Sequence, residues 1–132
     1  MKGFKSNIEK ATLDKMNPRR VLYTGKHSQL VLMDPKPDEE TGEEVQKTVD
    51  QFFRFEKGEG TVSIDGVKQK VADGDAVIVP AGARHNVMNT SKTKELKLYT
   101  IYSPPEHQDG TVRKTKADGL AKLEEFDGKI TE

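Results

Sequence analysis

A strand that ends at a proline and restarts after a tight turn constrains this chain more than any other feature of its sequence. Residues 76–79 are apolar, and Pro80 can end their strand because proline has no backbone N–H to give to a sheet. Gly82 supplies the backbone freedom that a tight turn needs. The chain resumes at residues 84–89, so His85 stands at the start of the next strand. A histidine fixed just beyond a rigid turn is held in one direction, which makes it the first candidate for a functional side chain.

Short β-rich segments separated by turns recur along most of the chain. Residues 20–24 and 29–33 flank a glycine-containing turn, which predicts a hairpin, and Asp65-Gly66 predicts a second one. Further strands are expected at about 43–48, 50–57, 60–64, 67–71, 76–79, 84–89 and 95–102. Many short strands at regular spacing predict an all-β sandwich or barrel.

Helices are expected only towards the two ends of the chain. Residues 7–16 have the capping and apolar pattern of a short helix, and residues 114–126 predict a short docked helix or a frayed tail. The 132 residues correspond to one domain that is large enough to close a core. We expect the barrel core at about 20–105 and the C-terminal tail or helix at about 106–132.

Composition excludes several classes of function. Basic and acidic residues each number 22, so the net charge is zero and no basic face for nucleic acid is expected. No apolar run approaches the roughly 20 residues of a membrane span. The chain has no cysteine, which excludes disulfides and thiolate chemistry, and its first residues lack the apolar region of a secretory signal. A cytoplasmic location is therefore expected.

The turn described above carries a recognisable spacing. Gly74, Pro80, Gly82, His85 and Asn89 fill the pattern G-x5-P-x-G-x2-H-x3-N. This pattern resembles the second signature of the cupin superfamily. The resemblance implies a double-stranded β-helix, the cupin jelly-roll barrel of two antiparallel sheets, with short terminal helices.

The first signature of the same family, G-x5-H-x-H-x3/4-E-x6-G, can be placed by counting back from Gly58. Its glutamate position falls on Gln51, and its two histidine positions fall on Glu44 and Gln46. The spacing is thus present, but the usual ligands are replaced. From about residue 21 to 105 the chain resembles small single-domain cupins of the mannose-6-phosphate-isomerase-like group, with a degenerate first metal-binding signature.

The resemblance assigns Glu44, Gln46, Gln51 and His85 to one site, and two interpretations of that site remain open. In the first, these side chains hold a divalent metal such as Mn, Fe, Ni or Zn. Amides are weak ligands for Zn²⁺, so harder cations such as Mn²⁺ and Fe²⁺ would be favoured. In the second, the four side chains form a hydrogen-bonded polar cluster that lines a pocket at the mouth of the barrel.

Other candidate residues are less specific. Phe53 shares a strand face with Gln51 and is expected beside the pocket. Arg84 is a candidate for binding an anionic substrate, with an exposed strand arginine as the alternative. His27 and His107 are both expected to be exposed. No catalytic residue can be assigned from this sequence.

Three classes of function remain open. The first is a barrel that binds a small polar metabolite, and the second is a metal-dependent isomerase, dioxygenase or decarboxylase. The third is a structural or interaction dimer without catalysis. We expect a small-molecule ligand and a homodimer, with no nucleic-acid or membrane partner. The hairpin at about 21–33 is expected to form the dimer contact through Leu30 and Leu32, with Gln29, Val31 and Met33 as the alternative face.

Overall fold

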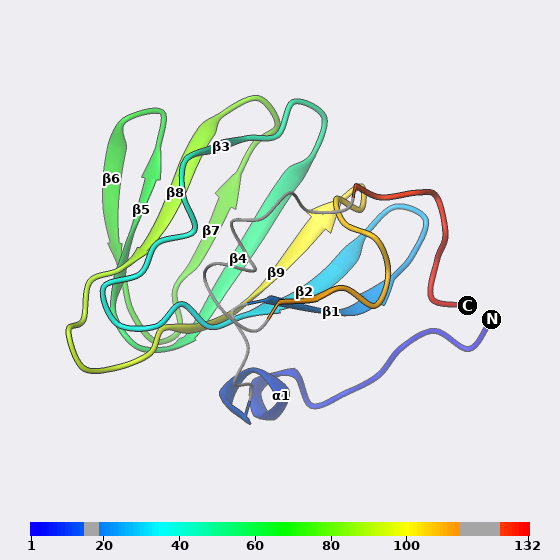
Figure 1. Ribbon diagram of the computed structural model, residues 1–132, viewed down its shortest axis with the longest axis horizontal. Helices are drawn as coiled ribbons and strands as arrows, with labels where there is room; N and C mark the ends of the chain where they lie inside the picture. The colour runs from blue at the N-terminus through cyan, green and yellow to red at the C-terminus, as the bar shows by residue number, and fades with distance from the viewer. Residues whose placement is uncertain (15–18, 114–124) are drawn as a thin grey trace.

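Two antiparallel β-sheets face each other and form the jelly roll (Figure 1). The computed structural model describes residues 1–14, 19–113 and 125–132, and these contain a six-stranded sheet in the order β10-β1-β2-β9-β4-β7 and a four-stranded sheet in the order β3-β8-β5-β6. The strands are β1 (Arg19–Thr24), β2 (Gln29–Met33), β3 (Glu44–Val45), β4 (Asp50–Lys57), β5 (Gly60–Ile64), β6 (Val67–Val71), β7 (Ala76–Val79), β8 (Arg84–Asn89), β9 (Lys97–Ser103) and β10 (Val112–Arg113). The all-β jelly-roll prediction is confirmed.

Most of the predicted strands are present within a few residues of their expected ends. The expected strand at 43–48 is an exception, because β3 pairs with β8 over only two residues. The hairpin at Asp65-Gly66 is confirmed, and both residues have positive φ (47° and 84°), as a tight hairpin turn requires. The short strand β10, which pairs with β1, was not predicted from the sequence.

The N-terminal helix is confirmed as α1 (Ile8–Asp14). Asn7 caps it, because its side-chain oxygen accepts a hydrogen bond of 3.0 Å from the backbone N–H of Lys10. Of the predicted C-terminal helix, residues 114–124 lie outside the described part of the chain. Glu125 forms an isolated β-bridge with His107. No helix among the described residues is long and apolar enough to cross a membrane.

The core lies between the two sheets and follows from side-chain alternation. Along β4 the burial alternates, so Gln51, Phe53 and Phe55 face inwards while Phe52 and Arg54 face outwards. The other inward-facing apolar side chains come from both sheets, and they include Val31, Val62, Val79, Val87 and Leu98. This packing holds the polar side chains on the same faces in fixed positions.

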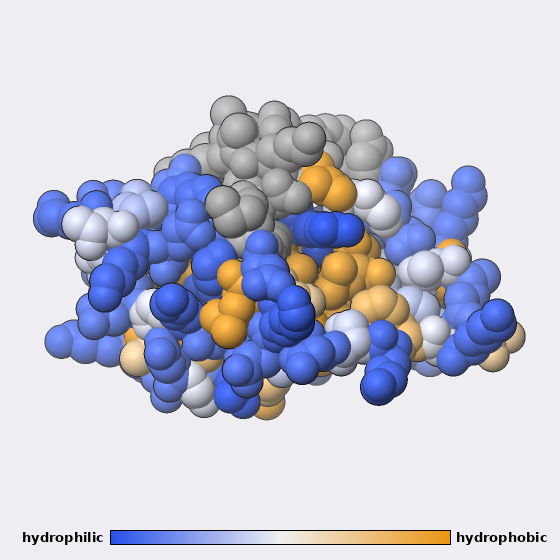
Figure 2. All heavy atoms as spheres, turned by 90° about the horizontal axis from the view of Figure 1, so that it is seen from below, coloured by the Kyte–Doolittle hydropathy of each residue, from blue (hydrophilic) through white to orange (hydrophobic). Residues whose placement is uncertain are grey.

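The outer face of the six-stranded sheet also carries apolar side chains. Leu30, Ile101, Phe52 and Ile78 lie opposite one another in register across β2, β9, β4 and β7. The helix α1 contacts β9 and β4 and lies below the sheet in Figure 1, on the side away from the four-stranded sheet. Figure 2 shows apolar surface on this side of the molecule. Ile78 is 65% exposed, whereas Leu32, expected at the surface, is only 2% exposed.

Candidate functional site

His85 is buried at the start of β8, where the preceding turn places it. Pro80 ends β7 as predicted, Gly82 has φ +90°, and the backbone N–H of Ala83 donates to the Pro80 carbonyl at 3.1 Å. The ring of His85 is 2% exposed and lies 5.9 Å from the Phe53 ring, centroid to centroid. Burial lowers the pKa of His85, and this effect outweighs the nearby Glu44 carboxylate, which acts to raise it. Burial therefore favours the neutral form of His85.

Glu44 and Gln46, two of the candidate residues predicted from the sequence, lie next to His85. Glu44 is the direct cross-strand neighbour of His85, and its Oε2 is 4.0 Å from the histidine Nε2. Gln46 donates from Nε2 to the same Glu44 oxygen at 3.5 Å. The structure thus brings Glu44, Gln46 and His85 together, as the sequence predicted. Gln46 Oε1 is buried and has no hydrogen-bond partner among the described residues, whereas a backbone hydrogen bond with Ala83 acts to raise the pKa of His85.

Gln51 belongs to a row of buried polar side chains on the inner face of the six-stranded sheet. Thr24, Gln29, Tyr102 and Gln51 lie opposite one another across β1, β2, β9 and β4. Gln51 donates from Nε2 to the Thr100 hydroxyl at 3.0 Å, and its Oε1 is buried without a partner. Of this row, only Gln51 was identified from the sequence. The others were missed because strand pairing across the sheet leaves no local signal in the chain.

The pKa of the Tyr102 hydroxyl is affected by several charged side chains. It is 1% exposed, and burial raises the pKa of its hydroxyl, with Arg19 acting to lower it and Glu44 acting to raise it. Burial also raises the pKa of Glu106, helped by Glu44 and opposed by Arg19. Charged groups from both sheets therefore act on the region around the Tyr102 hydroxyl, at one end of the barrel interior.

Arg19 is a second residue that the sequence did not reveal. It begins β1 on the inner face, opposite the buried Met33, and is 5% exposed. Its Nε and Nη1 atoms are buried and have no hydrogen-bond partner. An arginine at the edge of a predicted hairpin is ordinarily a surface residue, so nothing in the local sequence distinguished it from its exposed neighbour Arg20.

The prediction that His107 is exposed is wrong. His107 is 5% exposed, and its Nε2 lies 3.3 Å from the Tyr102 hydroxyl. Gln29 holds this segment: its Nε2 donates to the His107 carbonyl at 2.7 Å, and its Oε1 accepts from the backbone N–H groups of Glu106 and His107 at 3.2 and 3.0 Å. The segment around His107 therefore packs against the inner polar row and is not exposed to solvent.

Two further predicted residues have clear positions. Arg84 is exposed and pairs with Val45 across β8 and β3, so alternation turns it away from the face that carries His85. It does not join the interior cluster, which corrects its assignment to the pocket. His27 is exposed in the hairpin turn, as predicted.

The donor set at this end of the barrel is poor in strong metal ligands. Within the described residues, no group of three or more His, Cys, Asp and Glu side chains is arranged to hold a metal ion. One imidazole, one carboxylate and two amide carbonyls remain, and they fit no more than weak binding of a hard divalent cation. Gln46 Oε1 and Gln51 Oε1 are the amide oxygens of this set, and both are buried without a partner among the described residues.

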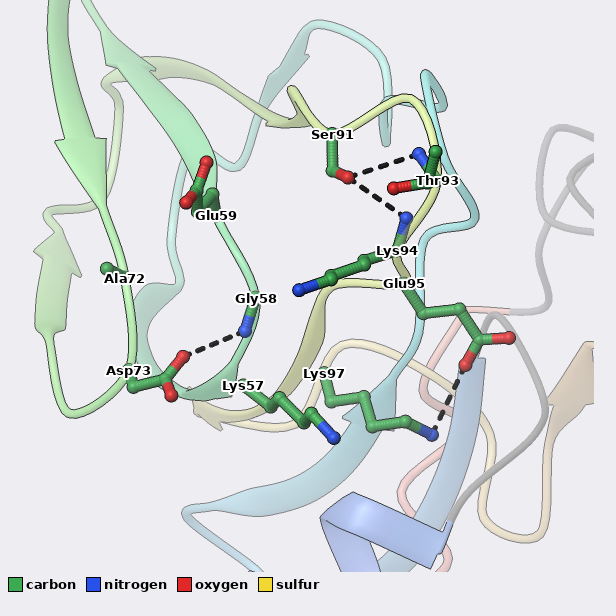
Figure 3. A pocket seen from close by; sticks show the side chains of 10 residues that line it. All are labelled: Lys57, Gly58, Glu59, Ala72, Asp73, Ser91, Thr93, Lys94, Glu95 and Lys97. Carbon is green, nitrogen blue, oxygen red and sulfur yellow. Dashed lines mark hydrogen bonds and ion pairs between the residues drawn. The ribbon is translucent and has the colours of Figure 1, made fainter.

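A separate cavity of about 920 Å³ lies at the opposite end of the barrel (Figure 3). Lys57 and Lys97, which pair across the far ends of β4 and β9, line it together with Lys94. Glu95 also lines it and binds Lys97, with Oε2 and Nζ 3.3 Å apart. The sequence did not predict this cavity.

A buried carboxyl group lies next to that cavity. Asp34 is fully buried directly after β2, with Lys36 Nζ at 3.3 Å and Lys97 Nζ at 3.6 Å from its Oδ2. Burial and the neighbouring Glu95 raise the pKa of Asp34 to about 6, against the effect of the two lysines. Burial alone would raise the pKa of Glu95, but its contacts with Lys36, Asp34 and Lys97 outweigh burial and lower it to about 2.

Comparison with known proteins identifies the family. Residues 31–102 match the family model described as a Cupin domain. The chain is 46% identical over 126 residues to the uncharacterized protein YrkC of Bacillus subtilis (strain 168), covering 91% of this chain and 67% of that protein. The crystal structure of BH2720 from Bacillus halodurans is similar, with 42% identity, a TM-score of 0.88, and coverage of 90% of this chain and 94% of that one.

A more distant structural neighbour supports the fold alone. KdgF from Halomonas sp. has a TM-score of 0.60 at 17% identity, covering 65% of this chain and 76% of that one. The family model, which spans more than half of the chain, and the two strong relatives agree with the observed jelly roll. The chain belongs to the cupin family.

Proposed function

We propose that the end of the barrel interior around Tyr102 binds a small polar metabolite, with any divalent cation held only weakly. The observation that carries this proposal is a set of buried polar atoms that have no partner within the described part of the chain: Arg19 Nε and Nη1, Gln46 Oε1 and Gln51 Oε1. Buried polar groups in folded proteins are almost always hydrogen-bonded, and each unpaired group costs about 1–3 kcal/mol. A polar ligand, together with water, would supply the missing partners.

These groups come from different elements but act on one region. Glu44 lies beside His85 and Gln46, and its charge acts on Tyr102. Arg19 acts on Tyr102 from β1. The interior therefore offers hydrogen-bond donors and acceptors from both sheets, which suits a ligand that carries several hydroxyl or carboxyl groups.

The orientation of Gln51 is fixed by its neighbour and supports the proposal. The Thr100 hydroxyl donates its single proton to the Phe52 carbonyl at 2.8 Å, so it can only accept from Gln51. Gln51 must then present Nε2 to Thr100 and leave Oε1 free. The same reasoning applies to Gln46, whose Nε2 faces the Glu44 carboxylate. Both free carbonyl oxygens thus call for a donor from a ligand or from water.

A binding experiment with a histidine variant tests the proposal. Small sugars, polyols and hydroxy acids would be titrated into the protein while heteronuclear NMR spectra are recorded. His85→Ala should abolish the binding of any compound that shifts the Gln51 side-chain amide signals, whereas His27→Ala, in an exposed turn, should leave that binding unchanged. Binding that survives His85→Ala would place the site elsewhere in the molecule.

Metal content separates this proposal from the enzyme alternative. The protein would be purified without chelators and analysed by inductively coupled plasma mass spectrometry. Our proposal predicts metal well below one equivalent per chain. One equivalent of Mn, Fe, Ni or Zn would instead favour a metal-dependent isomerase, dioxygenase or decarboxylase. As a check on the cluster's geometry, Gln46→His adds an imidazole beside Glu44 and His85 and should tighten Ni²⁺ or Zn²⁺ binding.

A further inference from the structure

Arg19 is buried, and among the described residues no carboxylate forms an ion pair with it. Its side chain is only 5% exposed. In the described part of the chain, no carboxylate lies within ion-pair distance of it, and Nε and Nη1 are without hydrogen-bond partners. Buried charges are normally paired, so an unpaired arginine in a barrel interior indicates a missing anion.

The neighbouring carboxyl groups do not fill this role. Glu106 and Glu44 act electrostatically on the same region, yet neither forms an ion pair with Arg19. Their negative charges also limit what else can bind, because a multiply charged anion would be repelled by them. A ligand with a single negative charge matches the single arginine best.

We infer that the small metabolite of the barrel interior is a hydroxycarboxylic acid, with its carboxylate bound by Arg19, an inference that rests on the function proposed above. Guanidinium and carboxylate groups match in geometry and can form two parallel hydrogen bonds. The free carbonyl oxygens of Gln46 and Gln51 accept hydrogen bonds from the ligand's hydroxyl groups, directly or through water. One anionic end and a hydroxyl-bearing remainder thus account for both kinds of unpartnered atom.

Matched pairs of small molecules provide the probes. Glycerate and glycerol differ only in the carboxylate, as do gluconate and sorbitol, and inorganic phosphate is the alternative oxyanion. Each would be titrated into the full-length protein and followed by heteronuclear NMR, with the side-chain Nε–H signal of Arg19 and the amide signals of Gln51 as reporters. We expect glycerate or gluconate to shift both signals and to bind at least about tenfold more tightly than its neutral partner.

Two arginine variants and one control make the test specific. Arg19→Met removes the charge while it keeps most of the side-chain volume, and it should weaken carboxylate binding by at least about tenfold. Arg19→Lys retains the charge without the planar fork and should bind carboxylate at an intermediate level. Arg20→Met, at the exposed neighbouring position, should leave binding unchanged. Because no carboxylate of the described residues pairs with the arginine, we also expect Arg19→Met to melt at the same temperature as the wild type or higher.

The outcomes distinguish this inference from the proposed function. If glycerol or sorbitol binds as tightly as its acid, and binding depends on His85 but not on Arg19, the inference is overturned while the proposed function stands. If phosphate alone gives Arg19-dependent shifts, the carboxylate assignment is wrong. A large loss of stability in Arg19→Met would mean that Arg19 is a structural residue, and that result also overturns the inference. If no probe shifts the Arg19 or Gln51 signals, neither the inference nor the proposed function holds for these ligand classes.

Discussion

Gln29 should contribute to stability far more than a strand glutamine usually does. It is 1% exposed, donates to the Thr24 hydroxyl at 2.9 Å and to the His107 carbonyl at 2.7 Å, and accepts from the backbone N–H groups of Glu106 and His107. Gln29→Leu removes all four hydrogen bonds and replaces the side chain with one of similar volume. The substitution therefore tests the hydrogen bonds with little change in packing.

The expected loss can be worked out from the groups left behind. His107 is buried, so the loss of the hydrogen bonds that Gln29 makes with its N–H and C=O should cost about 1–3 kcal/mol each. Glu106 is partly exposed, so water can replace the hydrogen bond of its N–H. Partial opening of the segment around His107 would recover some of the cost. We expect the free energy of unfolding to fall by about 3 kcal/mol.

Urea unfolding followed by circular dichroism measures this change through the midpoint at constant slope. Gln69→Leu, on the exposed strand β6, is the matched control and should change stability by less than about 0.5 kcal/mol. If Gln29→Leu loses less than about 1 kcal/mol, these hydrogen bonds do not hold the segment around His107 in solution, and the reasoning from unpaired groups is refuted.

Three other substitutions follow from the fold. Gly60→Ala should lower the free energy of unfolding by about 1–3 kcal/mol in thermal or urea unfolding, because its Cβ would lie 2.7 Å from a carbonyl oxygen of β8. Gly25→Ala, whose Cβ would have no neighbour closer than 3.5 Å, should leave the stability nearly unchanged, and equal losses in the two variants would contradict this reasoning. The pKa of Asp34 is raised from 3.8 to about 6, so the folded state binds the Asp34 proton more tightly than the unfolded state does. As the pH rises from about 4 to about 6, the stability of the wild type should therefore fall relative to that of Asp34→Asn. Thermal melts that show a constant difference between the two proteins across this pH range would refute the prediction. The homodimer stays a prediction: light scattering of the wild type should give about twice 14.8 kDa, and a mass near 14.8 kDa would contradict it. Ile78→Glu changes an exposed side chain and should yield a folded monomer, whereas Leu32→Glu changes a buried side chain and should unfold the chain.

Much of the sheet could be predicted because short local motifs in the sequence mark the turns between its strands. Pro80 and Gly82 mark the turn before β8, and Asp65-Gly66 marks the hairpin between β5 and β6. Side-chain alternation along β4 then placed Gln51 on the inner face. The spacing counted back from Gly58 pointed to Glu44 and Gln46, and the structure places Glu44 opposite His85 with Gln46 in contact with Glu44.

The rest of the site depends on contacts between distant segments. His107 follows two prolines after the last predicted strand, and only its fold back onto Gln29 makes it buried. Arg19 differs from Arg20 by one position in a strand, and its burial is decided by which face meets the core. Arg84 was misassigned to the pocket for the same reason, since it alternates with His85 and faces outwards.

A high-resolution crystal structure of the protein, purified without chelators or added acids, tests the central claim most directly. The claim is that the buried polar atoms around Tyr102 are a ligand site. It predicts electron density for ordered water or a small molecule within hydrogen-bonding distance of Arg19 Nε and of Gln51 Oε1, two buried atoms that have no partner among the described residues. The account would be contradicted if, in that crystal structure, Arg19 formed an ion pair with a protein carboxylate and Gln51 Oε1 accepted a hydrogen bond from a protein group.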